Sequence, residues 1–216
     1  DSANWAVGVP ALTTSLRGLV DAVIDVRVLE HAVHSGFFGG PILDANVLAA
    51  RLVATFHDDD GNVAVAGLTC APDPDIDYEE AQFRADSAVL DSVRLAGTGP
   101  ISARTWTRPA LNVIGWDAVR TSEASNTIAP TTRIKVSLRV APGQHPAEAY
   151  EALAKHILAN APFGAEVTVT PGDQGQPFAA PADSAAMQVA RAALSEAWGR
   201  PSVDIGVGGS IPFITD

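Results

Sequence analysis

Apolar and polar positions alternate along two stretches of the chain. Every second residue of the segment 20–28 is apolar, and the residues between them include Asp21, Asp25 and Arg27. The segment 134–140 repeats the pattern. A period of two is typical of a strand with one buried and one solvated face. Further short strands are expected at 63–68, at 111–116 and around 167–169.

Helical spacing of apolar residues predicts one helix after each of these two strands. Asp44 is a suitable N-cap for the first helix, and Pro146 suits the first turn of the second helix. The expected apolar faces are Val47, Leu48, Leu52 and Phe56 in the first helix, and Tyr150, Leu153, Ile157 and Leu158 in the second.

Two segments interrupt this regular pattern. Prolines and acidic residues lead through 69–110 into a looser helix at 78–90, and we interpret 69–110 as an insert in a smaller core. A Gly/Pro-rich link at 172–181 is typical of a domain boundary.

The C-terminal part is expected to hold one more helix. Asp183 or Ser184 can cap this helix, and Gly199 ends it. Met187 and Trp198 are its expected core residues.

The order of the elements favours an α+β fold. A strand–helix–strand unit, the insert and a second strand–helix–strand unit predict a split βαβ (ferredoxin-like) arrangement, with a four-stranded antiparallel sheet and both helices on one face. An open edge of this sheet, here the strand at 63–68, offers a surface for pairing across a two-fold axis.

Composition and charge narrow the class of protein. The chain has 216 residues, of which 47% are hydrophobic, and its formal net charge is −11. This charge argues against nucleic-acid partners and anionic membrane surfaces, because both need clustered Lys and Arg. We expect no membrane span, since no run of about 18 apolar residues occurs. The single Cys70 fits a reducing, cytoplasmic compartment. Without an initiator Met, the chain is expected to be a piece of a longer protein.

Two glycine-rich turns carry candidate chemistry. His34 precedes Gly36, Gly39 and Gly40, and a histidine on such a loop can donate a hydrogen bond or a proton to a ligand. The turn at 206–212 can offer backbone N–H groups to an anion. A plain surface histidine and a plain tight turn are the alternative interpretations.

Five motifs in order resemble the dinuclear-zinc peptidase family of carnosinase, cytosolic dipeptidases, aminoacylase and succinyl-diaminopimelate desuccinylase, and most closely its bacterial dipeptidase-like branch. The motifs span nearly the whole chain. They are Asp1-Ser-Ala-Asn-Trp with Pro10-Ala-Leu-Thr-Thr-Ser-Leu-Arg17-Gly18, His34-Ser-Gly-Phe-Phe-Gly-Gly40, Asn126-Thr-Ile-Ala-Pro130, Ser137-Leu-Arg139-Val-Ala-Pro-Gly-Gln144 and Gly208-Gly-Ser210-Ile-Pro212.

The resemblance implies a division into domains. In this family a catalytic zinc domain is interrupted by a lid, or dimerisation, domain, and the predicted split βαβ core is similar to that lid. Residues 18–172 are then the lid, with the insert near 69–110. Residues 1–17 and 173–216 are remnants of the α/β catalytic domain.

The resemblance also implies roles for single residues. Asp1 stands where the family has a zinc-ligating aspartate. His34 matches the lid histidine that reaches the active site of the partner subunit in a homodimer. There it would polarise the scissile carbonyl and stabilise the oxyanion.

Other positions match the part of the family's site that binds substrate. Arg139 matches an arginine that holds the substrate's C-terminal carboxylate, a role that suits a planar guanidinium. Gly209 and Ser210 match a turn that binds the same carboxylate. Asn126 and Thr127 lie in a segment that lines the substrate pocket. A solvated strand residue is the alternative interpretation of Arg139.

The chain also departs from the family pattern. The other ligands of the two zinc ions would precede Asp1 or follow Asp216, and the arginine often found just before the Gly-Gly-Ser turn is replaced by Asp204-Ile-Gly-Val207. A catalytic zinc site needs about three protein ligands plus a water. We therefore expect this chain alone to be inactive. Its parent would hydrolyse small peptides with a zinc-bound water.

Three hypotheses of function follow. The first is the lid, dimer and carboxylate-binding portion of a zinc-dependent dipeptidase. The second is the same portion of an N-acyl amino acid deacylase or desuccinylase. The third is a dimerisation module without chemistry.

Overall fold

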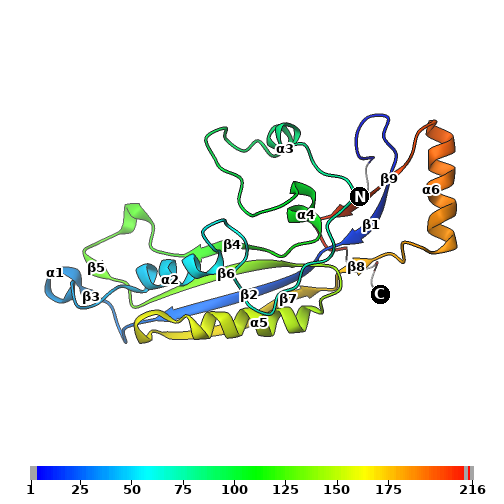
Figure 1. Ribbon diagram of the computed structural model, residues 1–216. Helices are drawn as coiled ribbons and strands as arrows, with labels where there is room; N and C mark the ends of the chain where they lie inside the picture. The colour runs from blue at the N-terminus through cyan, green and yellow to red at the C-terminus, as the bar shows by residue number, and fades with distance from the viewer. Residues whose placement is uncertain (1–3, 212–213, 215–216) are drawn as a thin grey trace.

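A computed structural model describes residues 4–211 and residue 214 of the chain. Its largest sheet has the order β4-β6-β2-β7, with every neighbouring pair antiparallel. The strands are β2 (Gly18–Arg27), β4 (Ala110–Asp117), β6 (Thr131–Val140) and β7 (Glu166–Gly175). This order confirms the split βαβ arrangement (Figure 1).

Two helices cover one face of this sheet. They are α2 (Ala45–Val53) and α5 (Pro146–Ala159), and both pack on the alternating apolar residues of β2 and β6. Asp44 caps α2 as predicted, because its carboxylate accepts hydrogen bonds from two backbone N–H groups. Val47 and Leu158, expected on the apolar faces, are instead exposed at the edges of their helices.

The segment 63–68 is not a strand, which corrects one expectation. It holds a single bridge between His57 and Val63, and Val65 is buried as part of a loop. Gly61, shortly before the segment, and Gly67, near its end, both have positive φ, so the backbone turns at these points instead of extending. The second core strand is β4, beyond the insert, and the edges of the sheet are β4 and β7.

A second, three-stranded sheet lies at one end of the first (Figure 1). Its order is β8-β1-β9, with β1 antiparallel to β8 and parallel to β9. The strands are β1 (Ala11–Leu16), β8 (Phe178–Ala179) and β9 (Val203–Val207). Strand β7 continues past Pro171 through a register shift, which a bulge on an edge strand accommodates. The predicted link at 172–181 therefore contains the end of β7 and all of β8.

The insert packs against this second sheet. It contains α3 (Glu80–Ser87) and α4 (Ile101–Trp106), whereas the sequence predicted one helix at 78–90. A Cβ at Gly206 of β9 would lie 2.6 Å from Cβ of Trp106. The ring of Trp106 meets Trp5 edge-on, with centroids 5.5 Å apart. The insert is thus tied to the N-terminal segment and to β9.

The last helix, α6 (Ala185–Trp198), is capped by Ser184 and ends at Gly199 as predicted. None of its described residues is buried, and Trp198 is 45% exposed. Met187 is half-buried. The expectation that Met187 and Trp198 are core residues is therefore wrong for this chain.

A small ribbon forms the far end of the molecule. Strand β3 (Val33–His34) pairs with β5 (Thr127–Ile128), and the one-turn helix α1 (Ser35–Phe38) follows β3. The 3₁₀ turns within residues 4–211 are η1 (Ala54–Phe56), η2 (Thr121–Glu123) and η3 (Pro162–Gly164). No helix in the described part of the chain combines the length and the apolar character needed to cross a membrane.

Candidate functional site

The candidate residues fall into two groups at opposite ends of the four-stranded sheet. The hinge cluster comprises Arg17, Arg139, Gly208, Gly209 and Ser210, where the two sheets meet. The tip comprises residues 33–38 and 126–128 at the other end (Figure 1). Asp1, the expected zinc ligand, lies outside the described residues.

Strand pairing assembles the hinge cluster. Leu19 of β2 lies opposite Arg139 on one side and opposite Gly175 on the other. Arg17 directly precedes β2 and is close enough to Arg139 for the two positive charges to repel each other. A Cβ at Gly175 would lie 3.3 Å from Oγ of Ser210. The pairing therefore gathers Arg17, Arg139 and Ser210, which are far apart in sequence.

The guanidinium of Arg17 links three segments. Its Nε donates to the carbonyl of Gly208 at 3.2 Å, and its Nη1 donates to the carbonyls of Arg104 and Arg108 at 3.4 and 3.3 Å. A Cβ at Gly208 would lie 2.6 Å from Nη2 of Arg17, so any side chain here would force one of the two groups to shift. Arg17 therefore joins the start of β2, the insert and the glycine turn.

Positive charge at the hinge cluster has no acidic counterpart among the described residues. None of their seven ion pairs involves Arg17 or Arg139. Arg17 is only 8% exposed, and this burial lowers its pKa to about 10, with repulsion from Arg139 adding to the effect. Buried charges in proteins are usually paired, so this cluster is chemically suited to bind an anion.

The tip presents an imidazole to solvent. Nδ1 of His34 accepts a hydrogen bond from the backbone N–H of Gly36 at 3.0 Å. In the neutral ring the proton is then on Nε2, which can donate it outward. A Cβ at Gly36 would lie 2.9 Å from Cε1 of His34, so the glycine permits this geometry.

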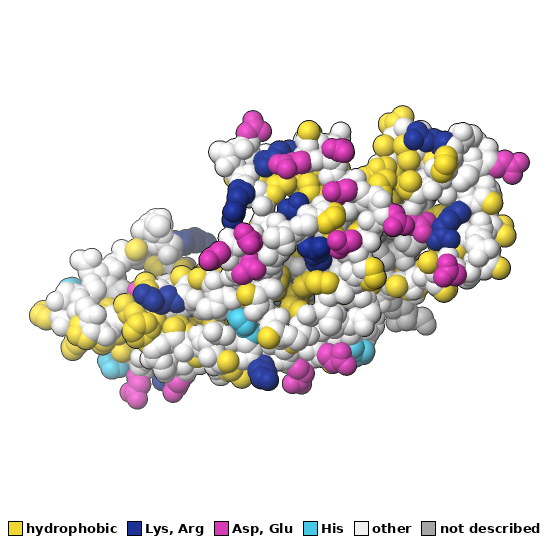
Figure 2. All heavy atoms as spheres, in the orientation of Figure 1, with side chains coloured by type: hydrophobic (Ala, Val, Ile, Leu, Met, Phe, Trp, Pro, Cys, Tyr) yellow, Lys and Arg dark blue, Asp and Glu magenta, His cyan; other side chains and the backbone are white. Residues whose placement is uncertain are grey.

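Strand pairing also brings the other tip candidates beside His34. Thr127 is the register partner of His34, and the carbonyl of Asn126 accepts from the N–H of Ser35 at 2.9 Å. Phe37, in contact range of the His34 ring with centroids 5.2 Å apart, is 83% exposed. Hydrophobic side chains are visible at this end of the surface (Figure 2).

The two groups cannot meet within one chain. Arg139 pairs with Leu19 at one end of β2, and the tip follows Arg27 at the other end. Eight residues of extended strand separate Leu19 from Arg27, which corresponds to about 27 Å. A small ligand held by the hinge cluster is out of reach of His34 in the same chain.

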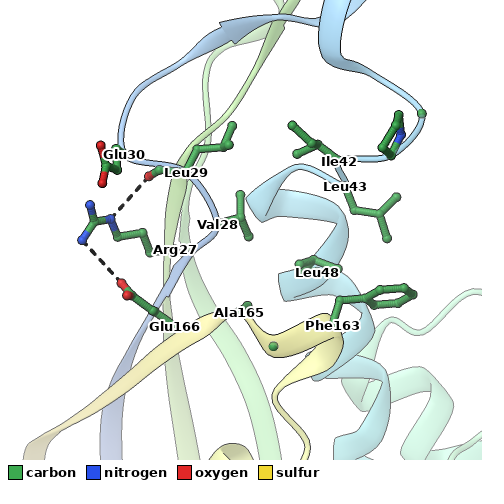
Figure 3. A pocket seen from close by; sticks show the side chains of 13 residues that line it. Arg27, Val28, Leu29, Glu30, Ile42, Leu43, Leu48, Phe163, Ala165 and Glu166 are labelled. Atoms are coloured by element: carbon green, nitrogen blue, oxygen red, sulfur yellow. Dashed lines mark hydrogen bonds and ion pairs between the residues drawn. The ribbon is translucent and has the colours of Figure 1, made fainter.

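A cavity of about 760 Å³ lies beside the tip but contains none of the candidate residues (Figure 3). Val28, Leu43 and Phe163 give it apolar walls. At its rim Arg27 pairs with Glu166 at 3.4 Å and donates to the carbonyl of Leu29. Arg27 is thus already paired, and the lining holds none of the residues that the family resemblance marks as functional.

The described residues do not fit a complete zinc site. No group of three or more His, Cys, Asp or Glu side chains among them is placed to hold a metal ion. Asp204, in the segment before the glycine turn, instead forms a two-pronged ion pair with Arg191 at 3.0 and 2.5 Å.

One known protein family matches most of the chain. The family model described as the peptidase dimerisation domain matches residues 14–165. The chain belongs to the M20 peptidase family. The family resemblance read from the sequence motifs is therefore confirmed.

Individual relatives of this M20 chain agree with that assignment. It is 37% identical over 217 residues to the cysteinylglycine-S-conjugate dipeptidase of Corynebacterium striatum, covering 99% of this chain and 48% of that protein. The chain thus spans about half the length of that relative.

Solved structures share the fold. The dipeptidase Dug1p of Saccharomyces cerevisiae superposes with a TM-score of 0.76 at 21% identity, covering 98% of this chain and 47% of that one. The M20 family metallo-carboxypeptidase Sso-CP2 of Sulfolobus solfataricus gives 0.75 at 18% identity, covering 98% and 57%.

Sequence reasoning gave Arg17 no role in the M20 chain, although the residue is at the centre of the hinge cluster. Its motif was recognised, but its burial depends on contacts with Gly208, which is 191 residues away. The pattern of apolar residues near Arg17 in the sequence cannot predict a contact with so distant a residue.

Proposed function

We propose that this chain is the lid, dimerisation and substrate-carboxylate-binding portion of a zinc-dependent dipeptidase. Residues 18–172 would form the lid, and residues 1–17 and 173–216 would belong to the catalytic domain. The family match over 14–165 and the dipeptidase relative support this assignment.

The hinge cluster would bind the free carboxylate at the C-terminus of a small peptide. Arg139 would form the two-pronged contact that a planar guanidinium makes with a carboxylate. Ser210 Oγ and the backbone N–H of Gly209 would donate to the same group. The proposal is supported by the absence of a carboxylate partner for Arg139 among the described residues.

His34 would act in the active site of a second copy of the chain, with Asn126 and Thr127 lining the pocket. Its Nε2–H would polarise the scissile carbonyl and stabilise the oxyanion that forms there. The observation that carries this proposal is the separation of about 27 Å along β2 between the two groups. A homodimer would bring them together, since a two-fold axis exchanges equivalent ends of two chains.

Zinc would be held outside the described residues. The two ions implied by the family resemblance would take their ligands from Asp1 and from parts of the protein beyond this sequence. The described residues would contribute binding and polarisation. We expect the 216-residue chain alone to show neither stoichiometric zinc binding nor turnover, which metal analysis and a peptide assay after zinc loading would measure.

Complementation between two inactive variants tests the proposal. In the full polypeptide that contains this sequence, His34→Ala and Arg139→Met would each lose most of their activity as homodimers when the substrate concentration is well below KM, the first through kcat and the second through KM. A mixed dimer would regain one intact site, because that site takes His34 from one subunit and Arg139 from the other. Random mixing in equal amounts would restore about a quarter of the wild-type activity, since half of the dimers are mixed and each has one good site of two.

The same assay separates the alternatives. No recovery after demonstrated subunit exchange would contradict the shared site. Turnover of N-acyl amino acids but not of dipeptides would favour a deacylase, and no turnover by the wild-type polypeptide would favour a dimerisation module.

A further inference from the structure

Arg17 holds a charge that its contacts do not balance. All three of its hydrogen bonds go to neutral backbone carbonyls, and its Nη2 has no hydrogen-bond partner among the described residues. Burying a cation against neutral groups and beside another cation is costly, because neither replaces the lost hydration of the charge. Such an arrangement becomes favourable when an anion binds nearby.

The position of Nη2 indicates where that anion would lie. Nη2 would lie 2.6 Å from a Cβ built on Gly208, and Gly208 directly precedes Gly209 and Ser210. Arg139 pairs with Leu19 at the start of β2 and is close enough to Arg17 for the two charges to repel each other. The turn is therefore in contact with the guanidinium of Arg17, and the positive charge of Arg139 is nearby.

We propose that Arg17 is a positioning residue for the substrate carboxylate, fixing the Gly208–Ser210 turn through the Gly208 carbonyl and adding a second positive charge behind it. This inference rests on the proposed function and deepens it. The turn donates N–H and O–H groups, and these bind an anion well only when their directions are fixed before binding. Arg17 supplies this fixation from a buried position, with the insert as the second anchor through Arg104 and Arg108.

The proposal assigns Arg17 two properties, a positive charge and hydrogen bonds to three carbonyls, and substitutions by lysine and by methionine test them separately. Arg17→Lys keeps a positive charge but cannot reach three carbonyls at once, whereas Arg17→Met keeps the approximate volume and removes the charge. Both variants would be measured in the full polypeptide, with a dipeptide and with the amide of the same dipeptide as substrates. The amide lacks the negative charge, so each variant is compared with itself and the fraction of folded protein cancels.

For Arg17→Met we expect KM for the free dipeptide to rise about tenfold or more, as for loss of a hydrogen-bonded charge. KM for the amide and kcat for both substrates would change less than about twofold. Arg17→Lys would raise KM for the free dipeptide by about threefold or less, because most of the electrostatic attraction remains. Competitive inhibition by the free C-terminal amino acid and by its amide would follow the same order.

Equal effects on the free dipeptide and the amide would overturn the inference and leave Arg17 with a role in folding alone. No effect on either substrate would overturn it as well. In both cases the wild-type dipeptidase activity stands, so only the role of Arg17 fails. A wild-type polypeptide that cleaves no dipeptide would overturn the proposed function together with this inference.

Discussion

The two ends of the four-stranded sheet are built differently. At the hinge cluster, Arg17 is buried and makes three hydrogen bonds to segments that are distant in sequence. At the tip, the hydrogen bond of His34 reaches only two residues along the chain, and its ribbon has two pairs of residues. The hinge cluster is thus fixed by tertiary contacts, whereas the tip is fixed mainly by local ones.

This difference agrees with the separate roles proposed for the two regions, substrate binding at the hinge cluster and catalysis at the tip. A carboxylate clamp benefits from groups that are aligned before the ligand arrives, since alignment then costs nothing during binding. A histidine that acts in another subunit must instead protrude. It therefore has few contacts within its own chain, and its geometry depends on nearby residues such as Gly36.

The largest expected effect is at the tip. His34→Ala should lower kcat by about 10²–10³-fold, the usual result of removing one donor to an oxyanion. KM should change little, because the hinge cluster, which is proposed to bind the substrate carboxylate, is at the other end of the sheet. Steady-state kinetics of the full polypeptide would measure both constants.

His31→Ala is the matched control for this variant. It removes another exposed histidine three residues earlier and should leave kcat unchanged. Unchanged turnover in His34→Ala would remove the catalytic role assigned to the tip.

The next largest effect is expected at the hinge cluster, and it changes KM and not kcat. Arg139→Met should raise KM for free dipeptides by about 10- to 100-fold, since a two-pronged contact between charged groups is lost. Arg133→Met, on the same face of β6 but paired with Asp25 at 2.8 Å, is the control and should leave KM unchanged. A rise in KM in the control alone would show that the clamp lies elsewhere on the strand.

The sequence predicted the features that depend on contacts between residues close in sequence, and it failed where distant contacts decide the structure. The strands at 20–28 and 134–140, the Asp44 and Ser184 caps and the helix start at Pro146 depend on residues close in sequence, and all are confirmed. The segment 63–68 has the composition of a strand, but positive φ at Gly61 and Gly67 turns the chain.

The site shows the same limit. The family motifs pointed to Arg139 and Ser210, and the structure brings both to one end of the sheet through Leu19 and Gly175. The motifs could not reveal the burial of Arg17, because burial depends on how the insert and the glycine turn close over it. Tertiary packing of this kind leaves no periodic signal in a single sequence.

A smaller effect is expected on stability, when each of two neighbouring glycines is replaced by alanine. Gly208→Ala would place Cβ 2.6 Å from Nη2 of Arg17 and 2.9 Å from the carbonyl oxygen of Thr105, and the resulting overpacking should cost about 1–3 kcal/mol. At Gly209 a Cβ meets nothing within 4 Å, and neither glycine has a positive φ. Gly209→Ala should therefore stay within about 0.5 kcal/mol. Urea unfolding of both variants would give the difference, and equal losses would mean that Arg17 does not constrain Gly208.

The smallest effect is expected on removing Arg27, an arginine near the tip that is already paired with an acidic residue. Arg27 pairs with Glu166 at 3.4 Å, and both side chains are at least half exposed. Arg27→Met should change the free energy of unfolding by less than about 1 kcal/mol, because water and salt screen such pairs. It should also leave the preference for a free dipeptide over its amide unaltered. A lost preference would mean that any positive charge on the sheet attracts the substrate, whereas an unaltered preference agrees with a carboxylate bound at the hinge cluster, where neither Arg17 nor Arg139 has an acidic partner among the described residues.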